Sequence, residues 1–179
     1  MARATRWVFA AALLCSACSS SGSTSGTTQP ASTTTDARSA AVLPRVDLIK
    51  EAVKALETKL GGPQQFFEVN ATTSLVNMIV ALNDGKLAQP WVYLGGSLSS
   101  TEPGDATGFS FAGSALDFEP EKVFSQLQAQ LPSSTPDLFF VEGGAGGLVR
   151  YSVAVTSTQG GQLIVVVGPD GKVISVDPN

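Results

Sequence analysis

Histidine is absent from the whole chain, and the only two cysteines, Cys15 and Cys18, lie close to the N-terminus. After residue 18, a Ser-His or Cys-His nucleophilic pair and a zinc site built on histidine or cysteine are therefore excluded. The serines do not form a G-x-S-x-G elbow or an S-x-x-K motif, and no Asp-rich EF-hand spacing occurs. With no cysteine pair to form a disulfide there, stability must come from packing. We expect a protein without enzymatic activity and without a cofactor.

Charged residues are also scarce, at 15% of the chain against 43% apolar residues. Once residues 1–17 are removed, nine Lys and Arg remain against 15 Asp and Glu, which gives a net charge of −6. Such a domain lacks the Lys/Arg footprint that phosphate contacts need, so we exclude nucleic acid as a partner. It would also dock poorly on anionic lipid, so contact with a membrane would require a covalent anchor.

The first 17 residues have the plan of a secretory signal. Arg3 and Arg6 provide a basic start, an apolar run covers residues 7–14, and small residues follow. The run is about eight residues long, whereas a membrane-spanning helix needs roughly 20. We therefore predict a cleaved signal rather than a permanent transmembrane segment.

The end of this signal, LLCSAC at residues 13–18, resembles a bacterial lipobox, at which a lipoprotein precursor is acylated and cut. Cys15 stands where that pattern usually has an aliphatic residue, whereas Ser16 and Ala17 match it. The resemblance implies that Cys18 bears the lipid, palmitate included, and becomes the first residue of a protein held on the extracytoplasmic face of the cell membrane. The alternative is an ordinary secretory signal cut near Ala17.

Residues 18–41 form the second segment. After Cys18 they read SSSGSTSGTTQPASTTTDARSAA, a composition that cannot bury enough apolar surface to fold. We predict a flexible linker with an end-to-end distance of roughly 25 Å. The Ser/Thr/Pro content resembles O-glycosylated tracts of some actinobacterial lipoproteins, and a bare spacer is the alternative.

Residues 42–179 have the apolar periodicities of an α+β domain. Apolar residues recur every three or four positions in two stretches, which predicts helices at residues 44–60 and 119–131. Between and after them lie short β-like runs bounded by turn residues. The predicted strands are 66–70, 75–82, 90–95, 108–113, 138–142, 148–156, 162–168 and 172–177, with a polar loop at 97–107.

The order of one helix and four strands occurs twice, in units of about 44–113 and 117–179. Aligning residues 63–95 with 136–168 at a constant offset of 73 gives ten identities in 33 positions. Such tandem units resemble cystatin-like folds, among them PepSY-type domains and the β-lactamase inhibitory proteins. Families of that kind commonly bind or inhibit other proteins outside the cell.

Trp91 and Tyr93 are the candidate partner-binding residues, because residues two apart in a strand share one face. An exposed aromatic face could anchor a protein or a lipid, and core packing is the alternative. The carboxylates Asp117, Glu119 and Glu121 could serve two-carboxylate chemistry, but the start of a helix explains them better. The glycine-rich stretch 143–147 lacks the Lys and Ser/Thr of a phosphate-binding loop, which favours a hairpin loop.

We therefore expect a lipid-anchored, non-enzymatic binding or interaction module at the cell envelope, with an envelope protein or lipid as ligand. The alternative is a lipid or glycolipid carrier, which would need a lined apolar cavity of several hundred Å³. A packed core with an exposed apolar sheet face would favour the protein-binding module.

Overall fold

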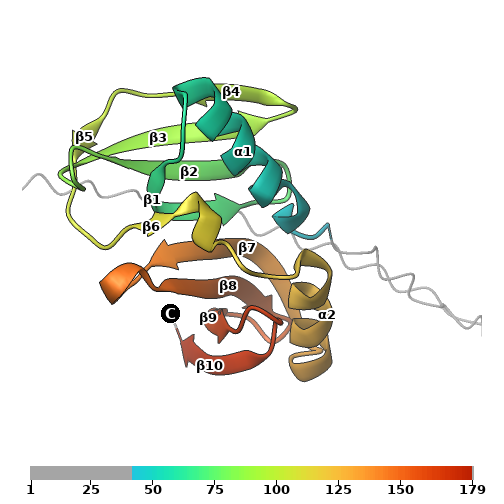
Figure 1. Cartoon of the computed structure of the whole chain (residues 1–179). Coiled ribbons are helices and arrows are strands. Elements are labelled where there is room, and N and C mark those ends of the chain that lie inside the picture. The colour runs from blue at the N-terminus through green and yellow to red at the C-terminus, as the bar shows by residue number, and fades with distance from the viewer. Residues whose placement is uncertain (1–41, 179) are drawn as a thin grey trace, which may run out of the picture. The chain divides into compact units, whose positions relative to one another are not determined.

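The computed structural model describes residues 42–178, which form a mixed α+β fold around one ten-stranded, antiparallel sheet (Figure 1). The predicted signal, Cys18 and the linker lie outside the described residues. The helical segments are η1 (Val46–Leu48), α1 (Ile49–Leu60), η2 (Gly113–Ala115), α2 (Pro120–Gln130) and η3 (Ala145–Gly147). The strands are β1 (Gln65–Ala71), β2 (Val76–Leu82), β3 (Leu87–Leu94), β4 (Ser97–Ser100), β5 (Gly104–Asp105), β6 (Phe111–Ala112), β7 (Ser134–Gly143), β8 (Val149–Ser157), β9 (Gln162–Val167) and β10 (Val173–Pro178).

The strand order is β10-β9-β8-β7-β1-β2-β3-β4, with β5 paired to β3 and β6 paired to β1. In the runs β1 to β4 and β7 to β10, strands that follow one another in sequence also lie next to one another. The two halves meet where β1 pairs with β7, so the first long strand of each half lies at the centre of the sheet. The folded region is thus built on one sheet rather than on two.

Helix α1 forms because its apolar residues fall on one side. Ile49, Val53 and Leu56 are at most 4% exposed and follow the three- and four-residue spacing of a helix face. The helix ends at Gly61, which adopts a left-handed φ of 83° that glycine takes without a Cβ clash. The first turn of the predicted helix is the short 3-10 segment η1.

Helix α2 confirms the second predicted helix to within one residue at each end. Pro120 is its first residue, a position where the missing N–H of proline costs no hydrogen bond. Val123, Phe124 and Leu127 form its buried side. Among the helices that the structure describes, none is long and apolar enough to span a bilayer.

One face of the sheet is buried without a break across the junction of the halves. Val69 on β1 is the cross-strand partner of Val141 on β7, and both are fully buried. The same row continues to Met78 and Trp91 on one side and to Tyr151 and Val167 on the other, through direct cross-strand pairs. Both α-helices contribute to the single hydrophobic cluster that covers this face.

Two predicted segments at the end of the first half need correction. Residues 97–107 were expected to form a loop, yet Ser97–Ser100 is β4 and Gly104–Asp105 is β5. Gly95 and Gly96 both have positive φ and make the two-residue hairpin turn that pairs β4 with β3. The strand expected at 108–113 is reduced to Phe111–Ala112, which pairs only with the start of β1.

Candidate functional site

Trp91 and Tyr93 lie in the core, not on the surface. They are 6% and 4% exposed and lie on the buried face of β3. The Tyr93 hydroxyl donates a hydrogen bond to Glu51, and the Lys59 ammonium lies 5.9 Å from the centroid of the Trp91 ring. The core-packing alternative therefore describes both residues, and a surface anchor for a partner cannot be built from them in this conformation.

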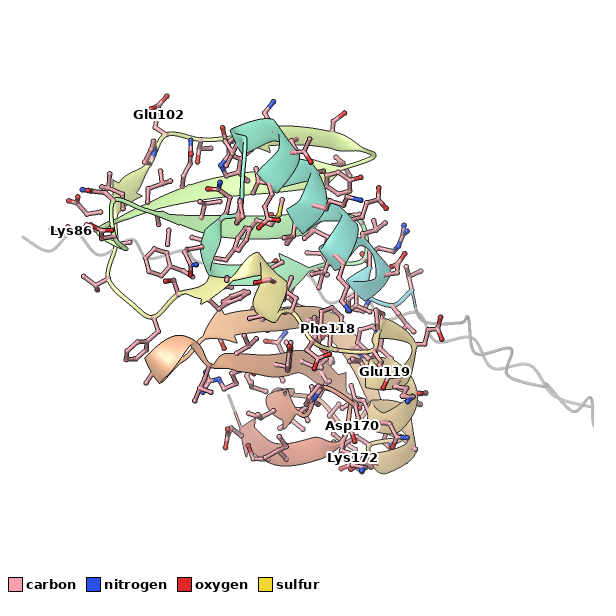
Figure 2. The ribbon with its side chains drawn as sticks, viewed as in Figure 1. Lys86, Glu102, Phe118, Glu119, Asp170 and Lys172 are labelled. Carbon is pink, nitrogen blue, oxygen red and sulfur yellow. The ribbon has the colours of Figure 1, made fainter. Side chains whose placement is uncertain are left out.

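The carboxylates at the start of α2 are explained by local structure. Glu119 precedes the helix and accepts from Lys122, whose pKa rises because of this hydrogen bond and the charge of Glu119. Figure 2 shows Glu119 beside Asp170 and Lys172, and the Glu119 N–H donates to the carbonyl of Pro169 in the turn between β9 and β10. Within residues 42–178 no group of three or more carboxylates forms a candidate metal site.

The glycine-rich stretch packs against another loop. A Cβ on Gly143 would lie 2.4 Å from the carbonyl oxygen of Phe109, so the backbones of the two loops touch at this point. Gly146 and Gly147 have positive φ within η3. Tight packing and turn geometry explain these glycines, in agreement with the predicted hairpin loop.

Surface depressions follow the margins of the helices. One of about 340 Å³ lies between α1 and η2, with Val53, Pro63 and Leu116 in its wall and Lys50 and Lys54 at its rim. A second, of about 540 Å³, lies between α1 and the turn from β3 to β4. Both depressions lie at the surface, whereas the sheet face beneath the helices is filled by side chains that are almost fully buried.

The opposite face of the sheet carries the arrangement that stands out chemically. Both α-helices bury their apolar sides against the other face, and most side chains of this face are half-exposed. We call it the open face. Its central cross-strand rows contain Val92, Asn77, Asn70, Phe140, Ser152 and Val166, and beside them Pro90, Ile79, Glu68, Glu142 and Arg150.

Five polar side chains, in two hydrogen-bonded groups, form a strip across the centre of the open face. Asn77 donates from Nδ2 to Asn70 Oδ1 at 2.8 Å, and Asn70 donates from Nδ2 to Glu68 Oε1 at 2.6 Å. Across the junction of the halves, Arg150 Nη2 donates to Glu142 Oε2 at 3.1 Å. The strip thus comes from four neighbouring strands, β2, β1, β7 and β8.

At the middle of this polar strip two glutamates are direct cross-strand partners. Glu68 on β1 is the direct cross-strand partner of Glu142 on β7, and both side chains lie on the open face. Cβ atoms of such partners are about 4.5–5.5 Å apart, and like charges placed this way are destabilising. The Glu142 side chain is 37% exposed and that of Arg150 62%, so the strip is accessible to a partner.

Apolar side chains border the polar strip on both halves of the sheet. Ile79 and Val92 lie beside it on the first half, and Phe140 and Val166 lie beside it on the second. Together they give the open face a polar centre between two apolar flanks. This pattern suits protein recognition, which combines apolar contact area with a few fixed polar groups.

The sequence alone does not reveal the polar strip. Glu68 and Glu142 lie 74 positions apart in the chain, and nothing in either local sequence indicates that the two residues meet. Only the pairing of β1 with β7 brings them together. The available signal was the alternation of the strands, which places Glu68 and Asn70 on the side opposite Val69.

A scan against protein-family models and searches of curated proteins and of solved structures found no match for this chain. Functional inference therefore depends on the chemistry of the chain itself.

Proposed function

We propose that this protein is a non-enzymatic, lipid-anchored lipoprotein of the extracytoplasmic membrane face, and that its folded domain binds another protein through the open face. The observation that carries the proposal is the half-exposed sheet face with its ordered polar strip and apolar flanks. Side chains held by strands and by one another are preorganised, which reduces the entropy lost on binding.

The anchor in this proposal is Cys18, and its support is the lipobox-like sequence at residues 13–18. Intact mass of the protein from the membrane fraction tests it. A mature chain that starts at Cys18 and carries acyl mass is expected. Recovery of a soluble form that starts elsewhere and lacks acyl mass would contradict lipidation of Cys18.

We further propose that the two halves are tandem helix-plus-four-strand repeats. Phe66 pairs with Val80 and Phe139 pairs with Val153, so the offset of 73 relates both members of a cross-strand pair. Each α-helix also precedes its half's main strands in the chain. In this interpretation the open face is a composite surface, with the polar strip on the seam of two related units.

The packing of the core favours a protein-binding module over a lipid carrier. Phe66, Met78 and Leu56 are fully buried where α1 covers the sheet. A carrier would need a lined apolar cavity between helix and sheet, and here that space holds side chains.

Site-specific photo-crosslinking in intact cells tests the binding surface. A photoreactive residue at Val92 samples the open face, and one at Lys54 on α1 samples the opposite side as a matched control. We expect a discrete crosslinked protein from position 92 and none from position 54. The same product from both positions, or none from position 92, would contradict binding through the open face.

A further inference from the structure

We infer that the partner places an arginine or lysine side chain between Glu68 and Glu142, with apolar residues of its own on either side of that cation. This inference rests on the proposed function, because it names the chemistry of the segment that the open face receives. It starts from the cross-strand register that sets Glu68 opposite Glu142.

The charge between these strands is only partly balanced within the described residues. Four ion pairs occur there, and Glu142 with Arg150 is one of them, whereas Glu68 belongs to none. Glu68 receives a hydrogen bond from the neutral Asn70 amide instead. Only Glu142 of this pair has a cationic partner, so a second positive group beside Glu68 would reduce the repulsion between the two glutamates.

The geometry favours a side-chain cation over a metal ion. Calcium takes six to eight oxygen ligands, but the only carboxylates at this point are Glu68 and Glu142, and Arg150 holds a positive charge beside them. A guanidinium needs only a fork of two hydrogen bonds to a carboxylate, and an ammonium needs still less space.

The neighbours of the two carboxylates specify the rest of the segment. Ile79 is the cross-strand neighbour of Glu68 on the side away from Glu142, and Phe140 lies two positions before Glu142 on the same strand face. A cation seated between the carboxylates therefore has apolar side chains within reach on both sides. Arginine flanked by aromatic or aliphatic residues matches this surface, and it is the charged residue most often found at the centre of interfaces.

The test uses a displayed library of short random peptides, selected on the purified full-length protein. We expect the selected peptides to carry arginine or lysine beside apolar residues, and to lose binding to a Val92→Lys variant. One such peptide is then synthesised with its arginine and again with citrulline, which keeps the shape and removes the charge. On the native protein citrulline should weaken binding roughly tenfold or more.

A double-mutant cycle locates the contact. On a variant with Glu68→Gln and Glu142→Gln, the arginine and citrulline peptides should bind alike. Glu121→Gln on α2 is the matched control and should preserve the difference. Glu68→Gln keeps the acceptor for Asn70, and circular dichroism checks that each variant is folded.

The outcomes separate this inference from the proposed function. Peptides that need Val92 but show no coupling between the arginine and the two carboxylates would overturn the inference and leave binding at the open face standing. A selection that yields only Val92-independent peptides, or no peptide, would overturn both.

Discussion

The Tyr93 hydroxyl on β3 donates a hydrogen bond of 2.5 Å to Oε1 of Glu51 on α1. The bond joins helix α1 to strand β3, and the Tyr93 ring is itself buried. The bond to Glu51, followed by burial and the negative charge of Glu51, raises the pKa of Tyr93 above its ordinary value of 10.0.

This hydrogen bond predicts that the free energy of unfolding falls at alkaline pH. The folded state holds the phenol proton of Tyr93 more tightly than the unfolded state does. The contribution of this hydrogen bond to the free energy of unfolding is therefore fully present below pH 10, and it is lost as the pH rises through the higher pKa of the folded state. Urea unfolding of the native protein and of Tyr93→Phe, at pH 7 and above pH 10, checks this. Tyr93→Phe should be less stable at pH 7 and should lose less on the change to alkaline pH.

Tyr151 also contributes to the loss of stability at alkaline pH. Burial raises its pKa as well, so part of the alkaline loss should persist in Tyr93→Phe. An unchanged alkaline loss in Tyr93→Phe would show that the bond to Glu51 is not the source.

The continuous core predicts that both halves unfold together. Phe66 in the first half and Phe139 in the second are fully buried, and truncation of a buried phenylalanine costs about 3–5 kcal/mol. Phe66→Ala and Phe139→Ala should each shift one common transition, followed by Trp91 fluorescence and by far-ultraviolet circular dichroism. Trp7, the only other tryptophan, lies in the predicted signal, so a chain that starts at Cys18 has Trp91 as its single tryptophan.

The position of Trp91 makes this result decisive. It lies in the first half, so its fluorescence should report Phe139→Ala in the second half as strongly as circular dichroism does. Two separate transitions, with Trp91 insensitive to Phe139→Ala, would contradict a single cooperative unit.

The close packing of Gly143 predicts that any side chain at this position destabilises the protein. A Cβ there would lie 2.4 Å from the carbonyl oxygen of Phe109, which is backbone and cannot turn aside. Gly143→Ala should cost about 1–3 kcal/mol, as overpacking usually does. Gly144→Ala is the matched control, because its Cβ would meet nothing closer than 3.4 Å. Thermal unfolding that shows equal losses would contradict the close contact.

The cross-strand pair of Glu68 and Glu142 predicts a stabilising substitution. Glu68→Gln removes the repulsion with Glu142 and retains an acceptor for Asn70, so it should stabilise the protein by about 0.2–1 kcal/mol. Glu142→Gln should gain less, because it also gives up the ion pair with Arg150. Urea midpoints of the two variants at low salt measure the difference. A destabilised Glu68→Gln would contradict the repulsion.

Local periodicity was sufficient to predict both helices and most strands. The three- and four-residue spacing of Ile49, Val53 and Leu56 predicts α1, and Pro120 marks the start of α2. The alternation in β8 predicts the burial of Tyr151, Val153 and Val155, whereas Ser152, on the side expected to be wet, is buried as well. These features depend on neighbours a few positions away, and the sequence displays them directly.

The features that depend on distant pairing could not be predicted in the same way. The serine-rich β4 looks like a loop because its strand state comes from pairing with β3 through Gly95 and Gly96. The polar strip depends on β1 meeting β7 in one particular register. Trp91 and Tyr93 share a face, as predicted, but which face carries the helices follows from tertiary packing.

The central position of β1 has a consequence for the growing chain during synthesis. A chain synthesised from its N-terminus completes β1 to β4 before β7 exists. The pairing of β1 with β7 joins residues far apart in the sequence, and such pairings form slowly. Until then residues 68–71 present an unpaired strand edge, a ready template for another chain. Chains that end before Ser134 should therefore self-associate through β1, whereas the complete chain covers that edge with its own second half.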